Sequence, residues 1–336
     1  MKKLLKILCV ALGMAMLLTV VTGCGAKENK TVDKVTVCEV THSIFYAPQY
    51  AAINLGFFKD EGIQIDLSNA EGTDKVMAAV LSNNINIGFA GPEASIYVYN
   101  QGKADYTQVF ALLTQRDGSF LVGRKPDPNF TWDKIRNKVV LPGRKGGIPY
   151  MTLEYVIRQN GLDPDKDTKL DNSIQFALMA GAFTSGTGDY VALFEPTASM
   201  LEAAGKGYIV ASIGKQSGEM SYTGYFAKKS YIEKNQDLIQ RFTKAIYKGQ
   251  QWVASHSAAE IAKEIAPSFP STDVKLLTTV VQRYKDIDVW SPNPVLKSDS
   301  FALLQKIMTQ AGELKQNTPY DKVVNTTFAQ KAVDAK

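Results

Sequence analysis

Apolar and polar residues alternate along VDKVTVCEV (32–40) and again along IQIDL (63–67), so each run predicts a β-strand. A helix is expected between them, from Pro48 to Gly56, because proline suits the first helical turn and glycine suits the helix exit. The alternation continues, with further helices and strands predicted at 73–81, 85–90, 93–100 and 106–114. This succession of strands and helices predicts an α/β fold.

An internal repeat indicates two similar halves. VMAAVLSNNINIGFAGPEAS (76–95) resembles LMAGAFTSGTGDYVALFEPTAS (178–199), and Pro92 pairs with Pro196 at an offset of 196 − 92 = 104 residues. Chance similarity of two α/β units is the other interpretation. Either way, both halves read as helix, polar turn, strand, proline and helix.

Two extended runs, 119–123 and 223–227, are expected to cross between the halves. Two crossings between α/β lobes form a hinge, and closure around a ligand is a known use of that architecture. The predicted first lobe consists of 35–120 and 224–336, and the second lobe of 121–223. The mostly helical residues after 230 are expected to pack on the first lobe.

The N-terminal segment has the organisation of a secretory signal peptide. Three lysines in the first six residues precede an uncharged apolar run, 7–22, and small residues lead to Cys24, so the predicted signal covers 1–23. VTGC resembles a bacterial lipobox with Val21 in place of the usual leucine, which implies a lipid thioether on Cys24 and an extracytoplasmic, membrane-anchored chain. A plain transmembrane anchor or an uncleaved signal is the alternative, although the run is shorter than the roughly 20 residues of a comfortable span. The polar residues 24–34 are expected to be a tether.

Composition excludes several classes of function. The chain has 336 residues, enough for two α/β domains, with 45% hydrophobic and 21% charged residues. The net charge of +5 falls to 5 − 3 = +2 without the signal's lysines, and no basic stripe indicates a nucleic-acid partner. Cys38 is left as a lone strand cysteine, expected to be a core residue. His42 and His256 are too few for a histidine-rich metal site, and we expect no cofactor or metal.

Features at the starts of helices point to a ligand site. Prolines at 48, 92, 149 and 196 each follow a predicted strand and open a helix, so four helix N-termini are expected to face one cleft. Such N-termini favour anions or strong hydrogen-bond acceptors, although the prolines could have only a structural role. Arg144 and Lys145 lie in a glycine-rich loop, 143–147, that is not a P-loop because it lacks Gly-Lys-Ser/Thr. A solvated basic turn is the other interpretation of this loop.

A carboxylate and several aromatic residues complete the prediction. Glu195 ends an apolar strand, where it could accept hydrogen bonds from ligand N–H groups or pair with Arg144 or Arg116. Aromatic residues after the first strand could stack on a planar ligand or fill the core. The predicted ligand-binding residues are His42, Phe45, Tyr46, Gly91, Pro92, Glu93, Arg144, Lys145, Gly146, Gly147, Glu195, Tyr222 and, at the cleft mouth, Trp290.

Four segments together resemble the substrate-binding lipoproteins of ABC importers. They are HSIFYAPQYAAINLGFFKDEGIQIDL, DKVMAAVLSNNINIGFAGPEASIY, GRKGGIPYMTLEYVI and YVALFEPTAS. The most similar branch holds alkanesulfonate-, taurine-, nitrate- and thiamine-pyrimidine-precursor-binding proteins. The resemblance implies a type II periplasmic-binding-protein fold of two lobes joined by two crossover strands. It also implies a monomer that delivers a small molecule to the permease and ATPase subunits of an importer.

The resemblance is less specific for the ligand. The family position that matches Glu195 is often a carboxylate that contacts the ligand. A glutamate at this position is similar to the pattern of the pyrimidine-binding members, in which it can accept hydrogen bonds from an aminopyrimidine. Arg144 and Lys145 instead favour a sulfonate, phosphate or carboxylate. A pyrimidine-type heterocycle with an acceptor or anionic group satisfies both, and an alkanesulfonate, taurine or nitrate-like anion is the alternative.

Two other classes of function remain open. A tethered receptor that docks to a sensor protein would have the same sequence features. The eukaryotic thiamine-pyrimidine synthase is an enzyme relative with histidine-donating, iron-dependent chemistry, but this chain lacks its cysteine-rich motif. We therefore expect no enzymatic activity.

Overall fold

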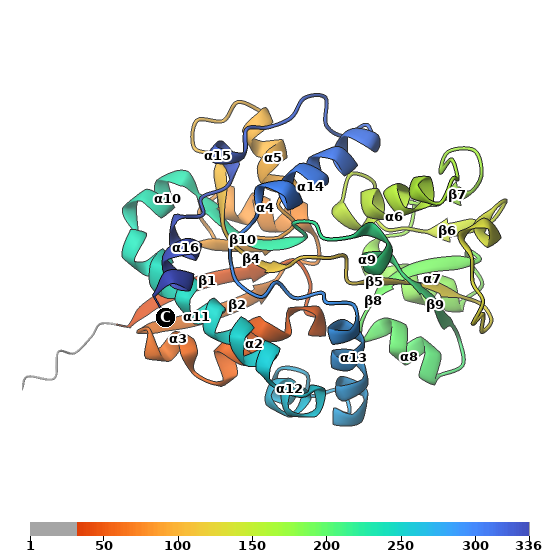
Figure 1. Cartoon of the computed structure of the whole chain (residues 1–336), viewed down its shortest axis with the longest axis horizontal. Coiled ribbons are helices and arrows are strands. Elements are labelled where there is room, and N and C mark those ends of the chain that lie inside the picture. Colours follow the sequence, from red (N-terminus) through yellow and green to blue (C-terminus); the bar gives the residue numbers. More distant parts are fainter. Residues whose placement is uncertain (1–31, 336) are drawn as a thin grey trace, which may run out of the picture. The chain divides into compact units, whose positions relative to one another are not determined.

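The computed structural model describes residues 32–335, and Figure 1 shows their helices and strands. The predicted signal peptide, Cys24 and residues 24–31 of the predicted tether lie outside the described residues. From Asp33 onward the chain forms one compact unit. It contains two five-stranded sheets, which confirms the predicted α/β class.

The first sheet combines parallel strands with one antiparallel strand. β1 runs parallel to β2 and β3, and β10 runs antiparallel to β3 and β4. Its strands in spatial order are β2 (Ile63–Asn69), β1 (Asp33–Glu39), β3 (Ile87–Ala90), β10 (Thr223–Lys228) and β4 (Thr107–Thr114).

The second sheet repeats this arrangement. β6 runs parallel to β7 and β8, and β5 runs antiparallel to β8 and β9. Its strands in spatial order are β7 (Lys169–Leu170), β6 (Val139–Leu141), β8 (Tyr190–Phe194), β5 (Ser119–Gly123) and β9 (Tyr208–Ser212). The shared strand order supports the internal repeat seen in the sequence.

The chain passes between the sheets at positions that differ from the prediction. Residues 119–123 and 223–227 were expected to cross, but they lie within the sheets as parts of β5 and β10. The connections are 115–118, between β4 and β5, and 218–222, which precedes β10. After each crossing the chain enters the other sheet as the strand that runs antiparallel to its neighbours, β5 or β10. In the sequence such a strand is an extended run that resembles a crossover.

Helices cover both sheets. Around the first sheet they are α2 (Ala47–Asn54), α3 (Phe57–Asp60), α4 (Thr73–Leu81), α5 (Glu93–Asn100), α10 (Lys229–Lys234), α11 (Gln236–Ser255), α12 (Ala258–Ile265), α13 (Val274–Asp286), α14 (Ser298–Gln310), α15 (Tyr320–Val323) and α16 (Thr327–Asp334). The second sheet has α6 (Ile148–Gln159), α7 (Met179–Thr184), α8 (Thr197–Ala203) and α9 (Ile213–Ser217). Short 3-10 turns are η1 (Ile44–Tyr46), η2 (Trp132–Ile135), η3 (Phe176–Leu178) and η4 (Ala266–Ser268).

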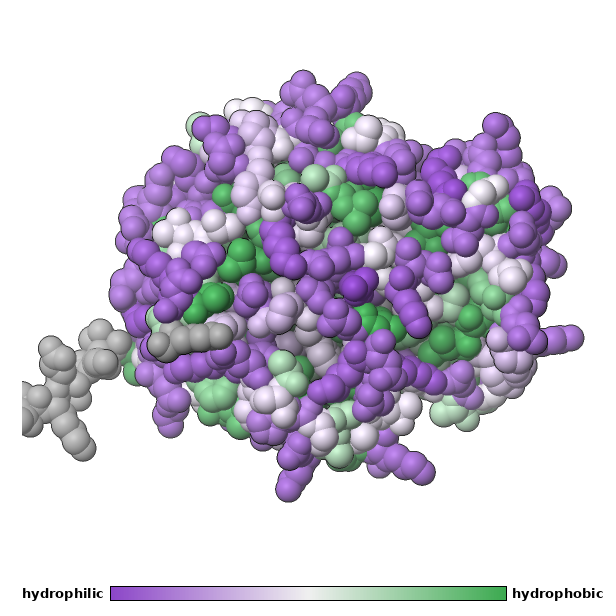
Figure 2. Space-filling view, viewed as in Figure 1, coloured by the Kyte–Doolittle hydropathy of each residue, from purple (hydrophilic) through white to green (hydrophobic). Residues whose placement is uncertain are grey.

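The hydrophobic core follows from this layering. All eight residues of β4 are buried although it ends the strand order, because α5, α11 and α16 pack on it. Of the helices expected to pack on the first lobe, α11 and α16 contact its sheet directly, α12 packs on α2 and α13, and α14 contacts both α5 and α6. Cys38 is a buried free cysteine in β1, as predicted. Hydrophilic residues cover most of the surface that Figure 2 shows.

Residues 32–335 contain neither a candidate membrane span nor a cluster of metal-ligating side chains. No helix in this part of the chain has both the length and the apolar character that a membrane span requires. Across the same residues, no group of three or more His, Cys, Asp or Glu side chains could hold a metal ion.

Candidate functional site

A cavity of about 360 Å³ lies between residues of the two sheets. Most of the segments that line it follow the carboxyl ends of strands, the edge at which open α/β sheets bind ligands. From the first-sheet side come Val40, Thr41, Tyr46, Glu71, Gly72, Thr73, Asp74, Lys75, Gly91 and Glu93. From the second-sheet side come Gly143, Arg144, Gly147, Ile148, Pro149, Asn172, Ser173, Ile174, Gln175, Phe176 and Phe194. Tyr222, at the end of the second crossing, and Thr223, at the start of β10, complete the lining.

Aromatic side chains form one part of the wall. The rings of Phe176 and Phe194 lie 5.9 Å apart, and those of Phe194 and Tyr222 lie 6.4 Å apart. Phe176 is 37% exposed, so its ring is accessible, whereas Tyr222 is buried. Aromatic faces of this kind can pack against a flat ligand.

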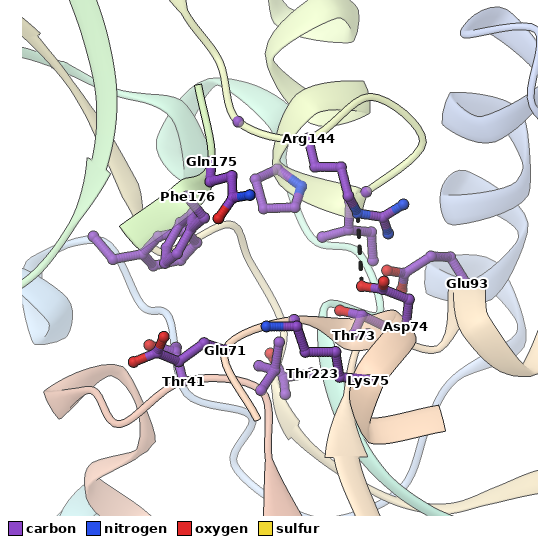
Figure 3. A pocket seen from close by; sticks show the side chains of 18 of the residues that line it. Thr41, Glu71, Thr73, Asp74, Lys75, Glu93, Arg144, Gln175, Phe176 and Thr223 are labelled. Atoms are coloured by element: carbon purple, nitrogen blue, oxygen red, sulfur yellow. Dashed lines mark ion pairs between the residues drawn. The ribbon is translucent and has the colours of Figure 1, made fainter. Parts of the chain in front are cut away.

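Charged side chains from both sides meet across the cavity. Arg144 Nε lies 3.8 Å from Asp74 Oδ1, and Figure 3 shows this ion pair together with Lys75, whose side chain points into the space between the two sides. Both partners of the ion pair are more than half exposed, so water screens it. The lining carries three carboxylates, Glu71, Asp74 and Glu93, and two cations.

Glu93 is the buried charge of the cavity. It is the first residue of α5 and is only 1% exposed. Burial raises the pKa of its carboxyl group to about 7, against the opposing effects of backbone N–H groups of Glu93, Ile148 and Ala94 and of the Arg144 charge. Its Oε2 atom is buried without a hydrogen-bond partner among the described residues.

The structure brings together part of the predicted site. Six predicted residues line the cavity: Tyr46, Gly91, Glu93, Arg144, Gly147 and Tyr222. The other seven do not line it: His42, Phe45, Pro92, Lys145, Gly146, Glu195 and Trp290. In the basic loop, Lys145 is exposed and Gly146 instead lies beside Glu313 and accepts a hydrogen bond from the Tyr97 hydroxyl.

Glu195 does not line the cavity, and its carboxylate has protein partners instead. Its carboxylate accepts hydrogen bonds from the backbone N–H and hydroxyl of Ser199, at 2.8 and 2.7 Å, and lies 3.1 Å from Nη1 of Arg283. The partner is therefore Arg283 of α13, and neither Arg144 nor Arg116. The carboxylate occupies the N-terminus of α8, so this helix start is closed to a ligand while α4, α5 and α6 begin at the cavity.

The residues predicted after the first strand are mostly structural. Phe45 is fully buried and packs on Tyr222 and Tyr284. His42 turns toward Glu39 and the carbonyl oxygen of Ser268, at 2.7 and 2.8 Å.

Trp290 also has a structural contact, since its Nε1 donates to the Phe45 carbonyl oxygen at 2.9 Å. Pro92, which is absent from the cavity lining, is the N-cap of α5. Neither Trp290 nor Pro92 lines this cavity, and the place of Trp290 at the cleft mouth stays a prediction.

Sequence reasoning missed two loops that line the cavity. Residues 71–75 follow β2, and residues 172–176 follow β7, so both occupy carboxyl ends of strands. The first was detectable, since Glu71 and Gly72 separate a predicted strand from the polar first turn of a helix predicted to begin at Thr73. The second was not, because β7 has only two residues and leaves no alternating pattern.

Comparisons with known proteins give the fold and the family. The structure of the alkanesulfonate-binding protein SsuA from Xanthomonas axonopodis pv. citri, bound to MOPS, is 14% identical, with a TM-score of 0.70 over 88% of this chain and 98% of that one. The periplasmic nitrate-binding protein NrtA from Synechocystis PCC 6803 is 15% identical, with a TM-score of 0.73 over 90% of this chain and 89% of that one. These likenesses confirm the predicted periplasmic-binding-protein fold.

Sequence similarity extends further with one bacterial relative. YtlA of Bacillus subtilis (strain 168), provisionally named a binding protein, is 49% identical over 310 residues, which cover 92% of this chain and 93% of YtlA. Residues 44–259 match the family described as NMT1/THI5 like. The chain therefore belongs to the NMT1/THI5-like family.

Proposed function

We propose that the chain is the extracytoplasmic solute-binding lipoprotein of an ABC importer and that it captures a small planar ligand without catalysis. The cavity carries this proposal, because residues from both sheets line it and because it combines aromatic walls with a few polar groups. Small-molecule sites in proteins have this character and start at about 300 Å³. The likeness to SsuA and NrtA, which are named for binding alkanesulfonate and nitrate, supports the proposal.

The two crossings provide a route to hinged closure. We propose two lobes, 35–120 with 224–336 and 121–223, that close when a ligand contacts both of them. Tyr222 and Thr223 line the cavity where the second crossing enters β10, so the ligand would touch the hinge itself. A ligand shifts such an equilibrium only through contacts that differ between the open and closed forms.

The proposed ligand is a pyrimidine-type heterocycle, as in thiamine precursors. Its flat ring would pack on Phe176 and Phe194, and its ring nitrogens and substituents would meet the polar lining. An alkanesulfonate, taurine or nitrate-like anion is the second candidate, favoured by Arg144 and Lys75. We rank it lower because Asp74 already faces Arg144 and three carboxylates line the cavity.

The remaining parts of the proposal concern location and partners. The lipobox-like sequence supports a lipid on Cys24 and attachment to the outer side of the membrane. The proposed partners are the permease and ATPase subunits, with the chain acting as a monomer. A receptor docking to a sensor would have the same cavity, and capture by an assembled permease would distinguish the two.

A ligand screen tests the function directly. Thermal shift and calorimetry of the purified full chain would compare 4-amino-5-hydroxymethyl-2-methylpyrimidine with taurine, methanesulfonate and nitrate. We expect saturable binding of the aminopyrimidine and a raised melting temperature. A preference for taurine, methanesulfonate or nitrate would refute the ligand class but keep the binding function. Failure of every compound to bind would count against the proposed function.

A further inference from the structure

We propose that Glu93 selects the ligand, by accepting a hydrogen bond from a ligand N–H group at its buried Oε2 atom. The pocket would then take amines, amidines or amino-substituted rings in preference to anions. This inference rests on the proposed function, and it assigns to Glu93 the role that the sequence suggested for Glu195.

The unsatisfied acceptor is the first argument. Glu93 is 1% exposed and lines the cavity, yet Oε2 has no hydrogen-bond partner among residues 32–335. A buried polar atom without a partner is costly, and a charged one more so. A ligand donor would remove that cost, whereas both carboxylate oxygens of Glu195 already have protein partners, Ser199 and Arg283.

The surrounding backbone holds the carboxylate in place. A Cβ atom at position 91 would lie 1.9 Å from Glu93 Oε2, so the carboxylate packs closely against the Gly91 backbone in space that a side chain would fill. Figure 3 shows the side chain directed from α5 toward Asp74 and Arg144. The backbone N–H of Ile148, which begins α6, also acts on this carboxylate. The acceptor therefore lies between elements of both sheets.

Charge balance argues against an anion next to Glu93. Glu71, Asp74 and Glu93 outnumber Lys75 and Arg144 in the lining, and Asp74 lies 3.8 Å from Arg144. A sulfonate placed beside an ionised Glu93 would repel it. A neutral or cationic N–H group has no such penalty and gains a charge-assisted hydrogen bond.

Protonation gives the two ligand classes opposite pH dependence. The charged and titratable groups that face Glu93 are Asp74, Arg144, Tyr46, Tyr97 and Tyr222. Because burial raises the pKa of Glu93 to about 7, its ionised fraction rises through neutrality. A donor ligand needs the ionised form and binds better at higher pH. An anion needs the protonated form and binds better at lower pH.

The test uses two probes and two variants of the full chain in detergent. The probes are 4-amino-5-hydroxymethyl-2-methylpyrimidine and the same ring without the amino group. Glu93→Gln keeps the shape of the side chain but removes its charge. Glu233→Gln is the matched control, since Glu233 is 58% exposed and its one ion pair within residues 32–335 is with Lys229 on α10. Thermal unfolding of each unliganded variant checks that it folds.

We expect Glu93→Gln to weaken the amino probe by on the order of 10- to 100-fold, as for hydrogen bonds to charged groups, and the amino-free probe by far less. In the native chain, which needs no variant, the amino probe should bind about tenfold more weakly at about pH 6 than at about pH 8. The assignment would be overturned if Glu93→Gln lost equal affinity for both probes, or if its affinity for the amino probe were unchanged. Tight methanesulfonate binding that strengthens at low pH would overturn it while leaving the solute-binding function intact.

Discussion

Glu195→Ala tests whether the structure places this carboxylate correctly. Glu195 is 1% exposed and fastens the start of α8 through Ser199, while Arg283 reaches it from α13 at 3.1 Å. Alanine would remove the acceptor for two hydrogen bonds and one ion pair. The Ser199 N–H would then stay buried without its partner.

The expected loss of stability can be worked from these contacts. Each hydrogen bond from Ser199 contributes about 1 kcal/mol. Breaking a fully buried ion pair costs about 3–5 kcal/mol. The cost is smaller here, because Arg283 is 29% exposed and keeps Glu202 at 2.5 Å. We therefore expect the free energy of unfolding to fall by about 3 kcal/mol, with ligand affinity changed much less.

Urea unfolding followed by tryptophan fluorescence measures this loss. The control is Glu233→Ala, because exposed pairs such as Glu233 and Lys229 contribute less than about 1 kcal/mol. Calorimetric titration with the aminopyrimidine gives the affinity of the same samples. If Glu195→Ala abolished binding and lowered the free energy of unfolding by less than about 1 kcal/mol, the carboxylate would face the ligand and our reasoning would be wrong.

Three further predictions concern single positions. Gly91→Ala places a Cβ 1.9 Å from Glu93 Oε2, so we expect the carboxylate to be displaced and aminopyrimidine affinity to fall about tenfold; unchanged calorimetric affinity would argue against this contact. Gly249→Ala should lower the melting temperature despite the better helix propensity of alanine, since its Cβ would lie 2.3 Å from the Pro48 carbonyl oxygen; a higher melting temperature would contradict the close packing of α11 on α2. The Glu39 carboxylate accepts a hydrogen bond from Nδ1 of His42 and raises the pKa of His42 above 6.5. The stabilisation that His42→Gln removes is therefore fully present below about pH 6.5 and is lost as pH rises through the folded-state pKa. Urea unfolding of both proteins at several pH values measures this loss, and the opposite trend would refute the prediction.

Local patterns were enough to predict most of the fold. The strand alternation at 32–40 and the proline and glycine of the first helix correspond to β1 and α2, although Gly56, with φ of 78°, leads on into the short α3. The offset repeat corresponds to two sheets with the same strand order. The crossings were misplaced, because an extended run has the same pattern whether it crosses between sheets or pairs inside one.

The site was harder to predict than the fold. Glu93 and Arg144 were predicted because they begin helices or lie in glycine-rich loops, which are local features. Glu195 has the same local features, but Arg283 lies 88 residues away in the sequence and decides where the carboxylate points. Which side chain of a helix start reaches the cavity depends on such distant partners, and one sequence does not show them.

Native mass spectrometry of the full chain, purified in mild detergent without refolding, tests the central claim most directly. We predict a co-purifying small molecule whose mass corresponds to a nitrogen-containing planar compound. It should be released on denaturation and retained less by Glu93→Gln than by Glu233→Gln. A chain that carries no small molecule and acquires none from the aminopyrimidine, taurine, methanesulfonate or nitrate would contradict the account.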